Sequence, residues 1–219
     1  MRREAAGAVG ADARPPPGRS AGRAVLAGVV ALVLGLALVN LLAARLLSEA
    51  GGVGGVLLVC AIGPLVEEAC KFGAFVAVAR PARRGWSGYW VLGLVFGVAE
   101  ALLKLGRFLT PETAWREDAA AAAALLAGAL ASLALHTALG GVVARVTGRR
   151  GLAAACAAHV AFNTLTLGAI FGLSSVWGEA GAQLGLGLSA TLALALLAVT
   201  WRTPAHGGDG APTGGTRRA

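Results

Sequence analysis

The chain of 219 residues has few of the charged side chains that a soluble protein needs. Asp, Glu, Lys and Arg make up 14% of it, whereas hydrophobic residues make up 57% and the mean hydropathy is +0.72. A soluble domain of this length needs far more polar surface. The composition therefore excludes an ordinary soluble protein and favours one that lies in a membrane.

Aromatic residues and cysteines are scarce as well. Aromatic residues make up 5%, so the apolar content is mainly Ala, Leu, Val and Gly, which suits packed helices better than the aromatic girdles of a β-barrel. The three cysteines, Cys60, Cys70 and Cys156, lie in apolar segments. An odd number at such positions gives no disulfide framework, and we expect small buried thiols.

A continuous basic stripe is also missing, although the formal net charge is +8. The positive residues form short clusters between apolar runs, which argues against a nucleic-acid partner. Residues 1–23 are rich in Pro, Gly and Arg, and residues 202–219 are rich in Gly and polar residues. We expect both segments to be flexible tails that flank a transmembrane domain at 24–201.

Six apolar runs between the tails have about the 20 residues that a membrane-spanning helix requires. The fold class that they predict is an all-α, polytopic membrane helix bundle with about six transmembrane helices. The expected spans are 24–47, 53–79, 88–109, 119–145, 151–173 and 182–201.

The distribution of Lys and Arg predicts the orientation of such a bundle. Six spans put both tails on one side, together with fourteen of the nineteen Lys and Arg residues, and leave four on the other side. Positive residues are enriched in cytoplasmic loops. We therefore expect both tails to be cytoplasmic.

The stretch GPLVEEACKFGAF, residues 63–75, places three charged residues inside an apolar run. Each charged side chain at the centre of a bilayer helix costs roughly 2.5 to 3.5 kcal/mol. Glu67 and Lys71 are four residues apart, so we expect them to share a helix face and neutralise each other. Glu68 lies about 100° round the helix and is free to point elsewhere. Pro64 removes a backbone hydrogen bond and is expected to open the helix one turn earlier.

Polar residues of four different spans lie at one depth. Counted from the predicted cytoplasmic ends of their spans, they lie roughly 12 to 18 Å deep, near the middle of the membrane. These residues are Glu68, Glu100, His136 and His159, with Asn163 in the same band. Scattered, tolerated polar residues would not coincide in this way, so the pattern predicts one polar site at mid-membrane.

Such a set of side chains is suited to hydrolysis. Desolvation disfavours the charged form of a carboxylate, which makes a glutamate an effective acceptor for a proton of water. His and Asn side chains can donate hydrogen bonds to a developing oxyanion. Zinc is the alternative, with Glu68, Glu100, His136 and His159 as its ligands. Against zinc, the chain has no HExxH pair, and Lys71 lowers the negative charge available to a cation.

Four motifs carry a resemblance to a known family. EEACK (67–71), FGVAE (96–100), HTALG (136–140) and HVAFN (159–163) resemble, in this order, the motifs of the PrsW family of glutamic-type intramembrane proteases. That family is similar to the CAAX-prenyl endopeptidases, and its superfamily includes the non-catalytic Aph subunit of gamma-secretase. The resemblance covers about residues 53–175.

The resemblance implies an endopeptidase that cuts membrane-anchored, single-span proteins, such as an anti-sigma factor, in a bacterial cell membrane and without a cofactor. It implies one role for each residue of the motifs: Glu67 as the water-activating base with Glu68 as its alternative, Glu100 holding the water, Lys71 orienting the glutamates, His159 and Asn163 binding the oxyanion, and His136 completing the pocket. The sequence leaves two other classes open, a membrane scaffold that clasps a partner helix and a transporter. The chain is small for a transporter and shows no inverted repeat.

Overall fold

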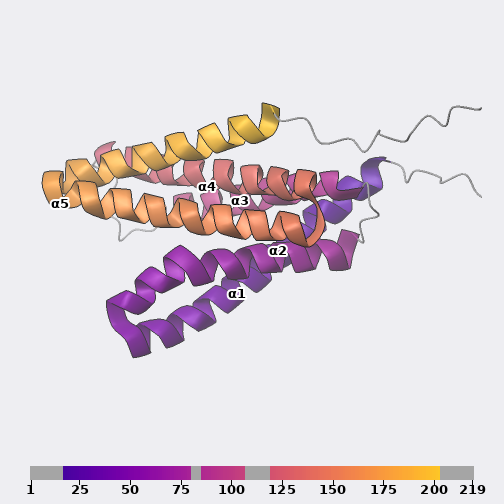
Figure 1. The fold of residues 1–219 in the computed structure, drawn as a ribbon, viewed down its shortest axis with the longest axis horizontal. Helices are drawn as coiled ribbons and strands as arrows, with labels where there is room; N and C mark the ends of the chain where they lie inside the picture. Colours follow the sequence, from indigo (N-terminus) through magenta and orange to yellow (C-terminus); the bar gives the residue numbers. More distant parts are fainter. Residues whose placement is uncertain (1–16, 80–84, 107–118, 203–219) are drawn as a thin grey trace, which may run out of the picture.

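The computed structural model describes residues 17–79, 85–106 and 119–202, and these residues are almost entirely helical (Figure 1). The elements in chain order are α1 (Pro17–Leu57), the π-helix η1 (Leu58–Ile62), α2 (Gly63–Ala79), the 3-10 helix η2 (Gly85–Ser87), α3 (Gly88–Gly106), α4 (Ala119–Val146) and α5 (Gly148–Arg202). The predicted all-α membrane bundle is confirmed. Because α1 begins at Pro17, residues 17–23 are helical, whereas the sequence placed them in a tail; the rest of both predicted tails, 1–16 and 203–219, lies outside the described residues.

Five helical stretches are long and apolar enough to cross a membrane, so the chain is a multi-pass membrane protein. They are Ala21–Ala43, Gly52–Ala79, Gly88–Gly106, Ala119–Val146 and Gly148–Arg202. A straight helix with the 55 residues of α5 would be roughly 80 Å long, more than twice the thickness of the hydrocarbon core. Gly178 breaks α5 with φ 58° and ψ −134°, and the two arms run in opposite directions (Figure 1). The last two predicted spans, 151–173 and 182–201, thus lie in separate arms of α5.

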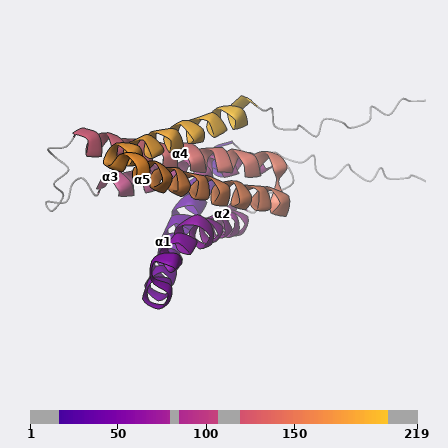
Figure 2. The ribbon, with the colours of Figure 1, turned by 60° about the vertical axis from the view of Figure 1, so that its left-hand side comes forward.

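Helices α1 and α2 form a pair that stands partly apart from the rest. The chain reverses near the end of α1, and α2 runs back along it (Figure 1). Seen from a second direction, the reversing end of this pair projects away from α3, α4 and α5 (Figure 2). The pair and the three other helices therefore meet closely over only part of their length.

Small residues allow α3 and α4 to pack closely. A Cβ atom on Gly97 would lie 3.0 Å from the Cα of Leu133, and one on Gly140 would lie 2.9 Å from the carbonyl oxygen of Tyr89. Real Cβ atoms essentially never come nearer than 3.0 Å, and a contact at 3.0 Å is unusually tight, so glycine is required at the second position and favoured at the first. This close packing sets the stretch of α4 around His136 against α3.

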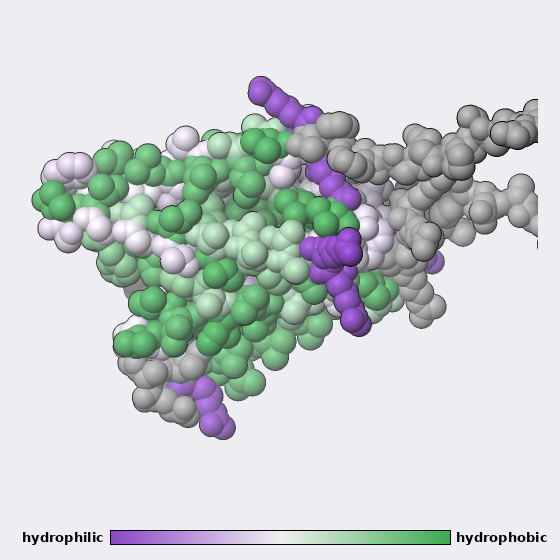
Figure 3. Space-filling view, in the orientation of Figure 1, coloured by the Kyte–Doolittle hydropathy of each residue, from purple (hydrophilic) through white to green (hydrophobic). Residues whose placement is uncertain are grey.

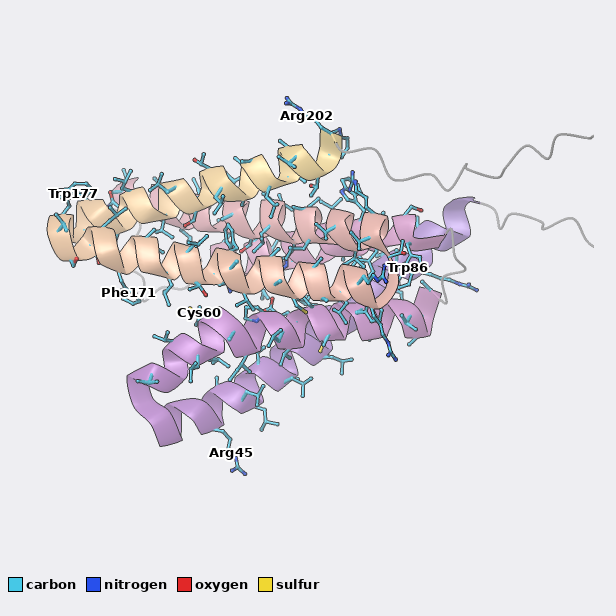
Figure 4. All side chains as sticks on the ribbon, viewed as in Figure 1. Arg45, Cys60, Trp86, Phe171, Trp177 and Arg202 are labelled. Atoms are coloured by element: carbon cyan, nitrogen blue, oxygen red, sulfur yellow. The ribbon has the colours of Figure 1, made fainter. Side chains whose placement is uncertain are left out.

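The outer surface matches the hydrocarbon of a membrane. Large apolar side chains such as Leu41, Leu165 and Val199 are more than half exposed along the sides, and Figure 3 shows mainly hydrophobic residues there. Arginines gather at the end of the molecule where α1 and α5 begin and α5 ends. Arg202 lies at this end and Trp177 at the opposite one (Figure 4), which fits interfacial anchoring of both ends.

The three cysteines are free, as expected. Cys60, Cys70 and Cys156 are, however, half-buried, whereas the sequence predicted buried thiols. The helices of a membrane bundle expose apolar faces to lipid, so an apolar neighbourhood in the sequence does not imply burial in protein.

Candidate functional site

The charged side chains of α2 meet polar side chains of α3, α4 and α5 in the interior of the bundle. Lys71 is the central cation, with 1% of its side chain exposed. Its ammonium pairs with Glu68, lies 3.0 Å from Nδ1 of His136 and lies 4.7 Å from the centre of the Phe96 ring. The partner of Lys71 is therefore Glu68 at i−3, and the ion pair expected with Glu67 at i−4 is replaced. Both spacings share a helix face, and tertiary packing decides between them.

His136 links Lys71 to the carboxylate of α3. Lys71 has only hydrogen-bond donors, so Nδ1 of a neutral His136 accepts from it and the ring proton lies on Nε2. Nε2 in turn contacts Oε2 of Glu100, whose other oxygen lies 2.9 Å from Nζ of Lys104. Glu100 and Lys104 are four residues apart and thus share a helix face, and Lys104 also donates to Ser132.

In His159 the ring proton lies on Nδ1, the nitrogen that accepts a hydrogen bond in His136. Nδ1 of His159 lies 3.0 Å from Oε1 of Glu68, and because a carboxylate only accepts, Nδ1 carries a proton and donates it. The other ring nitrogen, Nε2, faces Glu67. Glu68 is fully buried and holds both Lys71 and His159. It therefore fixes the tautomer and orientation of His159, as second carboxylates do for functional histidines.

Glu67 differs from its neighbour in both exposure and contacts. Its side chain is 24% exposed, and its Oε2 lies 3.9 Å from Nε2 of His136 and 3.9 Å from Nε2 of His159. These separations are too long for direct hydrogen bonds. The three atoms lie within 4.8 Å of one another, so one oxygen atom can reach all of them at about 2.8 Å. The geometry therefore suits a water molecule held between the carboxylate of Glu67 and the imidazole of His159, beside Nε2 of His136, whose proton already faces Glu100.

A cavity of about 390 Å³ opens beside these groups, and it is only half enclosed. Its wall includes Glu67, Glu100, His136, His159 and Asn163, contributed by α2, α3, α4 and α5. Val39 of α1 and Leu58 and Val59 of η1 complete it. The cavity thus lies where the α1–α2 pair diverges from the other helices, and it gives the polar groups access from outside the bundle.

The π-helix η1 leaves one backbone carbonyl in this wall without a partner in its own helix. The N–H of Gly63 donates to the carbonyl of Leu58 rather than to that of Val59. The next residue is Pro64, which has no N–H to donate to Val59 in the π register. Asn163 supplies the missing donor, with Nδ2 2.9 Å from the oxygen of Val59. One hydrogen of the Asn163 amide is therefore used here, and the second remains for another acceptor.

The residues that could hold a metal ion among those described are Glu67, His136 and His159. The zinc ligands expected from the sequence included the same two histidines but Glu68 and Glu100 in place of Glu67. In the structure Glu68 and Glu100 contact other sides of the histidines. Zinc ligands at about 2.0 to 2.1 Å in a tetrahedron lie about 3.4 Å apart, closer than the 3.9 Å found here. In addition, Nε2 of His136 carries a proton while Nδ1 accepts from Lys71, so it offers no lone pair to a cation. The arrangement fits water better than zinc.

The structure brings all seven candidate residues into one region of the bundle. Glu67, Glu68, Lys71, Glu100, His136 and His159 form one connected cluster, and Asn163 lies one turn from His159 on the cavity wall. Sequence reasoning did not find Ser132, which holds Lys104, or the carbonyl of Val59, which holds Asn163. Pro64 was the available signal for the second, because it was expected to open the helix.

Comparison with known proteins adds no identification. No family model, no curated protein and no solved structure matches this chain.

Proposed function

We propose that this protein is an intramembrane endopeptidase in which Glu67 activates water, as members of the PrsW family do. The observation that carries the proposal is the position of Glu67. Its carboxylate lies on an accessible cavity, faces two imidazoles across a gap of the size of a water molecule, and has a fully buried second glutamate behind it.

The arrangement supports the following reaction. Glu67 takes a proton from water as the water oxygen attacks the carbonyl carbon of a peptide bond, which forms a tetrahedral intermediate. The second amide hydrogen of Asn163 and a protonated His159 held by Glu68 donate to the oxyanion. The proton on Glu67 then passes to the leaving nitrogen, and the products are a carboxylic acid and an amine.

The charges of the cluster are consistent with this cycle. The cluster contains three carboxylates, Glu67, Glu68 and Glu100, and two ammonium groups, those of Lys71 and Lys104. One proton shared among Glu67 and the two histidines brings the cluster to neutrality. Buried charges are tolerated in lipid only when they are balanced in this way.

The substrate under this proposal is a single-span membrane protein, such as an anti-sigma factor, in a bacterial cell membrane. Half-enclosed access between the α1–α2 pair and the other helices supports lateral entry of a peptide chain from the lipid. The arginines at one end of the bundle support an orientation with both tails in the cytoplasm.

The test is cleavage of candidate single-span proteins by the purified chain in detergent, with products identified by mass spectrometry. We expect the wild type to cut and Glu67→Gln not to cut while it remains folded. Glu179→Gln is the matched control, because Glu179 is exposed directly after the break in α5, at the end of the molecule opposite Arg202. Cleavage that survives Glu67→Gln would refute the assignment. A chain that binds single-span proteins in every form but never cuts them would instead be a scaffold.

Metal dependence is tested in the same assay. Cleavage is expected to continue after dialysis against EDTA and 1,10-phenanthroline, because the three candidate ligands are spaced for water. Loss of cleavage on chelation, with recovery on addition of zinc, would establish the zinc alternative in place of water activated by Glu67 alone.

A further inference from the structure

The cavity wall has hydrogen-bonding capacity beyond the groups assigned to the reaction. Thr166 lies on the cavity one turn beyond Asn163 in α5, and its Oγ1 is buried with no hydrogen-bond partner among the described residues. Val59 of η1 also lines the cavity, and its carbonyl accepts a hydrogen bond from Asn163. Buried polar groups normally have partners, so an unpaired hydroxyl beside a cavity calls for one from outside the chain.

The neighbours of Thr166 show that its own helix could have satisfied it. In the same arm of α5, Thr164 donates to the carbonyl of Val160 at 2.8 Å. In the other arm, hydroxyls donate in the same way to the carbonyl four residues earlier, at 2.8 to 3.0 Å: Ser189, Thr191 and Thr200. Helical threonines populate two side-chain rotamers, so rotation about Cα–Cβ can redirect the hydroxyl of Thr166 toward a bound partner.

The polar side chains along α5 are spaced so that an extended peptide backbone could contact them in turn. His159, Asn163 and Thr166 follow one face of α5, and Thr166 lies roughly 10 Å along the helix from His159. An extended chain covers that distance in about three residues. A transmembrane helix that is cleaved must unwind around the scissile bond. The backbone N–H and C=O groups freed by this unwinding then need hydrogen-bond partners inside the membrane. A hydroxyl can both donate and accept, and the carbonyl of Val59 can accept.

We propose that Thr166 and the backbone carbonyl of Val59 form a subsite that binds the unwound backbone of the substrate, from the scissile bond beside Asn163 to about three residues away at Thr166. The subsite rests on the proposed function and names the class of substrate. It recognises main-chain groups rather than a particular side chain. The bound segment is therefore an extended stretch of a membrane span, which glycine and other poor helix formers in that span favour.

The experiment separates binding from cleavage. The probe is a fluorescein-labelled synthetic peptide with one leucine-rich span, interrupted at its centre by glycine and alanine. Its Kd is measured by fluorescence anisotropy on a Glu67→Gln background, and its KM and kcat are measured on the otherwise wild-type chain. The variants are Thr166→Val, which keeps the shape and removes the hydroxyl, and Thr166→Ser, which restores it. Thr164→Val is the control, because that hydroxyl is exposed and already bonded to its own helix.

We expect Thr166→Val to raise both Kd and KM about threefold to tenfold with little change in kcat, the loss of one hydrogen bond. Thr166→Ser and Thr164→Val are expected to behave as the wild type. Pro64→Ala is expected to weaken binding similarly, because it restores an N–H that can occupy the carbonyl of Val59 or return this turn to the α register. Unchanged Kd and KM in Thr166→Val would overturn the subsite even if cleavage proceeds. Binding that depends on Thr166 without any cleavage would uphold the subsite and refute the protease.

Discussion

The two adjacent glutamates of α2 are expected to respond in opposite ways to the same substitution. Glu68 is fully buried and carries the charge that balances Lys71, whose side chain is 1% exposed. Removal of one partner from a buried ion pair costs about 3 to 5 kcal/mol, because the other charge remains uncompensated. Glu68→Gln keeps an acceptor oxygen, so we expect the free energy of unfolding to fall by about 3 kcal/mol, the lower end of this range.

Glu67→Gln is expected to leave stability almost unchanged. The carboxylate is 24% exposed on the cavity, and it lies 3.9 Å from both His136 and His159, so the substitution removes no close ion pair. Partly exposed pairs of this kind contribute about 0 to 1 kcal/mol. Loss of a general base, in contrast, lowers kcat by about 10²-fold to 10⁴-fold. Glu67→Gln should therefore be stable and inactive.

The free energies are measured by reversible unfolding in mixed micelles with increasing dodecyl sulfate, followed by the fluorescence of the five tryptophans. Lys71→Met added to Glu68→Gln removes both charges and should recover about 2 kcal/mol or more, which a double-mutant cycle isolates. Equal destabilisation by Glu67→Gln and Glu68→Gln would refute the division between a cavity glutamate and a structural one. So would a double variant that is no more stable than Glu68→Gln.

Three further changes test other parts of the structure. Gly178→Ala should destabilise the chain by about 1 to 3 kcal/mol, because the backbone at the break in α5 has a positive φ that alanine rarely adopts. Gly172→Ala is the control, since Gly172 is helical with open space around it and should tolerate alanine. Equal effects of the two substitutions would contradict the break. Thr147→Gly should stabilise it by about 1 kcal/mol, since Thr147 has φ 59° between α4 and α5, and a loss of stability would argue against that conformation. Asn163→Leu should cost about 1 to 3 kcal/mol by leaving the carbonyl of Val59 unpaired and should also lower kcat, and unfolding that matches the wild type would exclude that contact.

The membrane fold followed from the sequence because lipid imposes a simple rule. Each span must be apolar over about 20 residues, and the span limits predicted from that rule lie within a few residues of the helical stretches Gly52–Ala79, Gly88–Gly106 and Ala119–Val146. The gathering of Glu68, Glu100, His136 and His159 was predicted for a similar reason. Helices of known rise that cross the same slab place their residues at predictable depths.

The details of the contacts in the polar cluster could not be predicted from the sequence. Lys71 at i+4 from Glu67 and i+3 from Glu68 can reach either, and the structure pairs it with Glu68 because His159 approaches the same carboxylate from α5. Nor does a sequence show which ring nitrogen of His136 meets Lys71, on which the argument against zinc depends. The tail limits were also imprecise, since residues 17–23 continue α1.

By itself the sequence determined the membrane setting and the apolar runs and predicted that polar residues of different spans gather, because hydropathy and helical rise are local properties of the chain. Only the tertiary structure decided which glutamate faces the cavity, which one is buried with Lys71, and which carbonyl Asn163 holds. Those choices depend on how α2 is rotated against α4 and α5, and that rotation is set by packing between segments more than sixty residues apart.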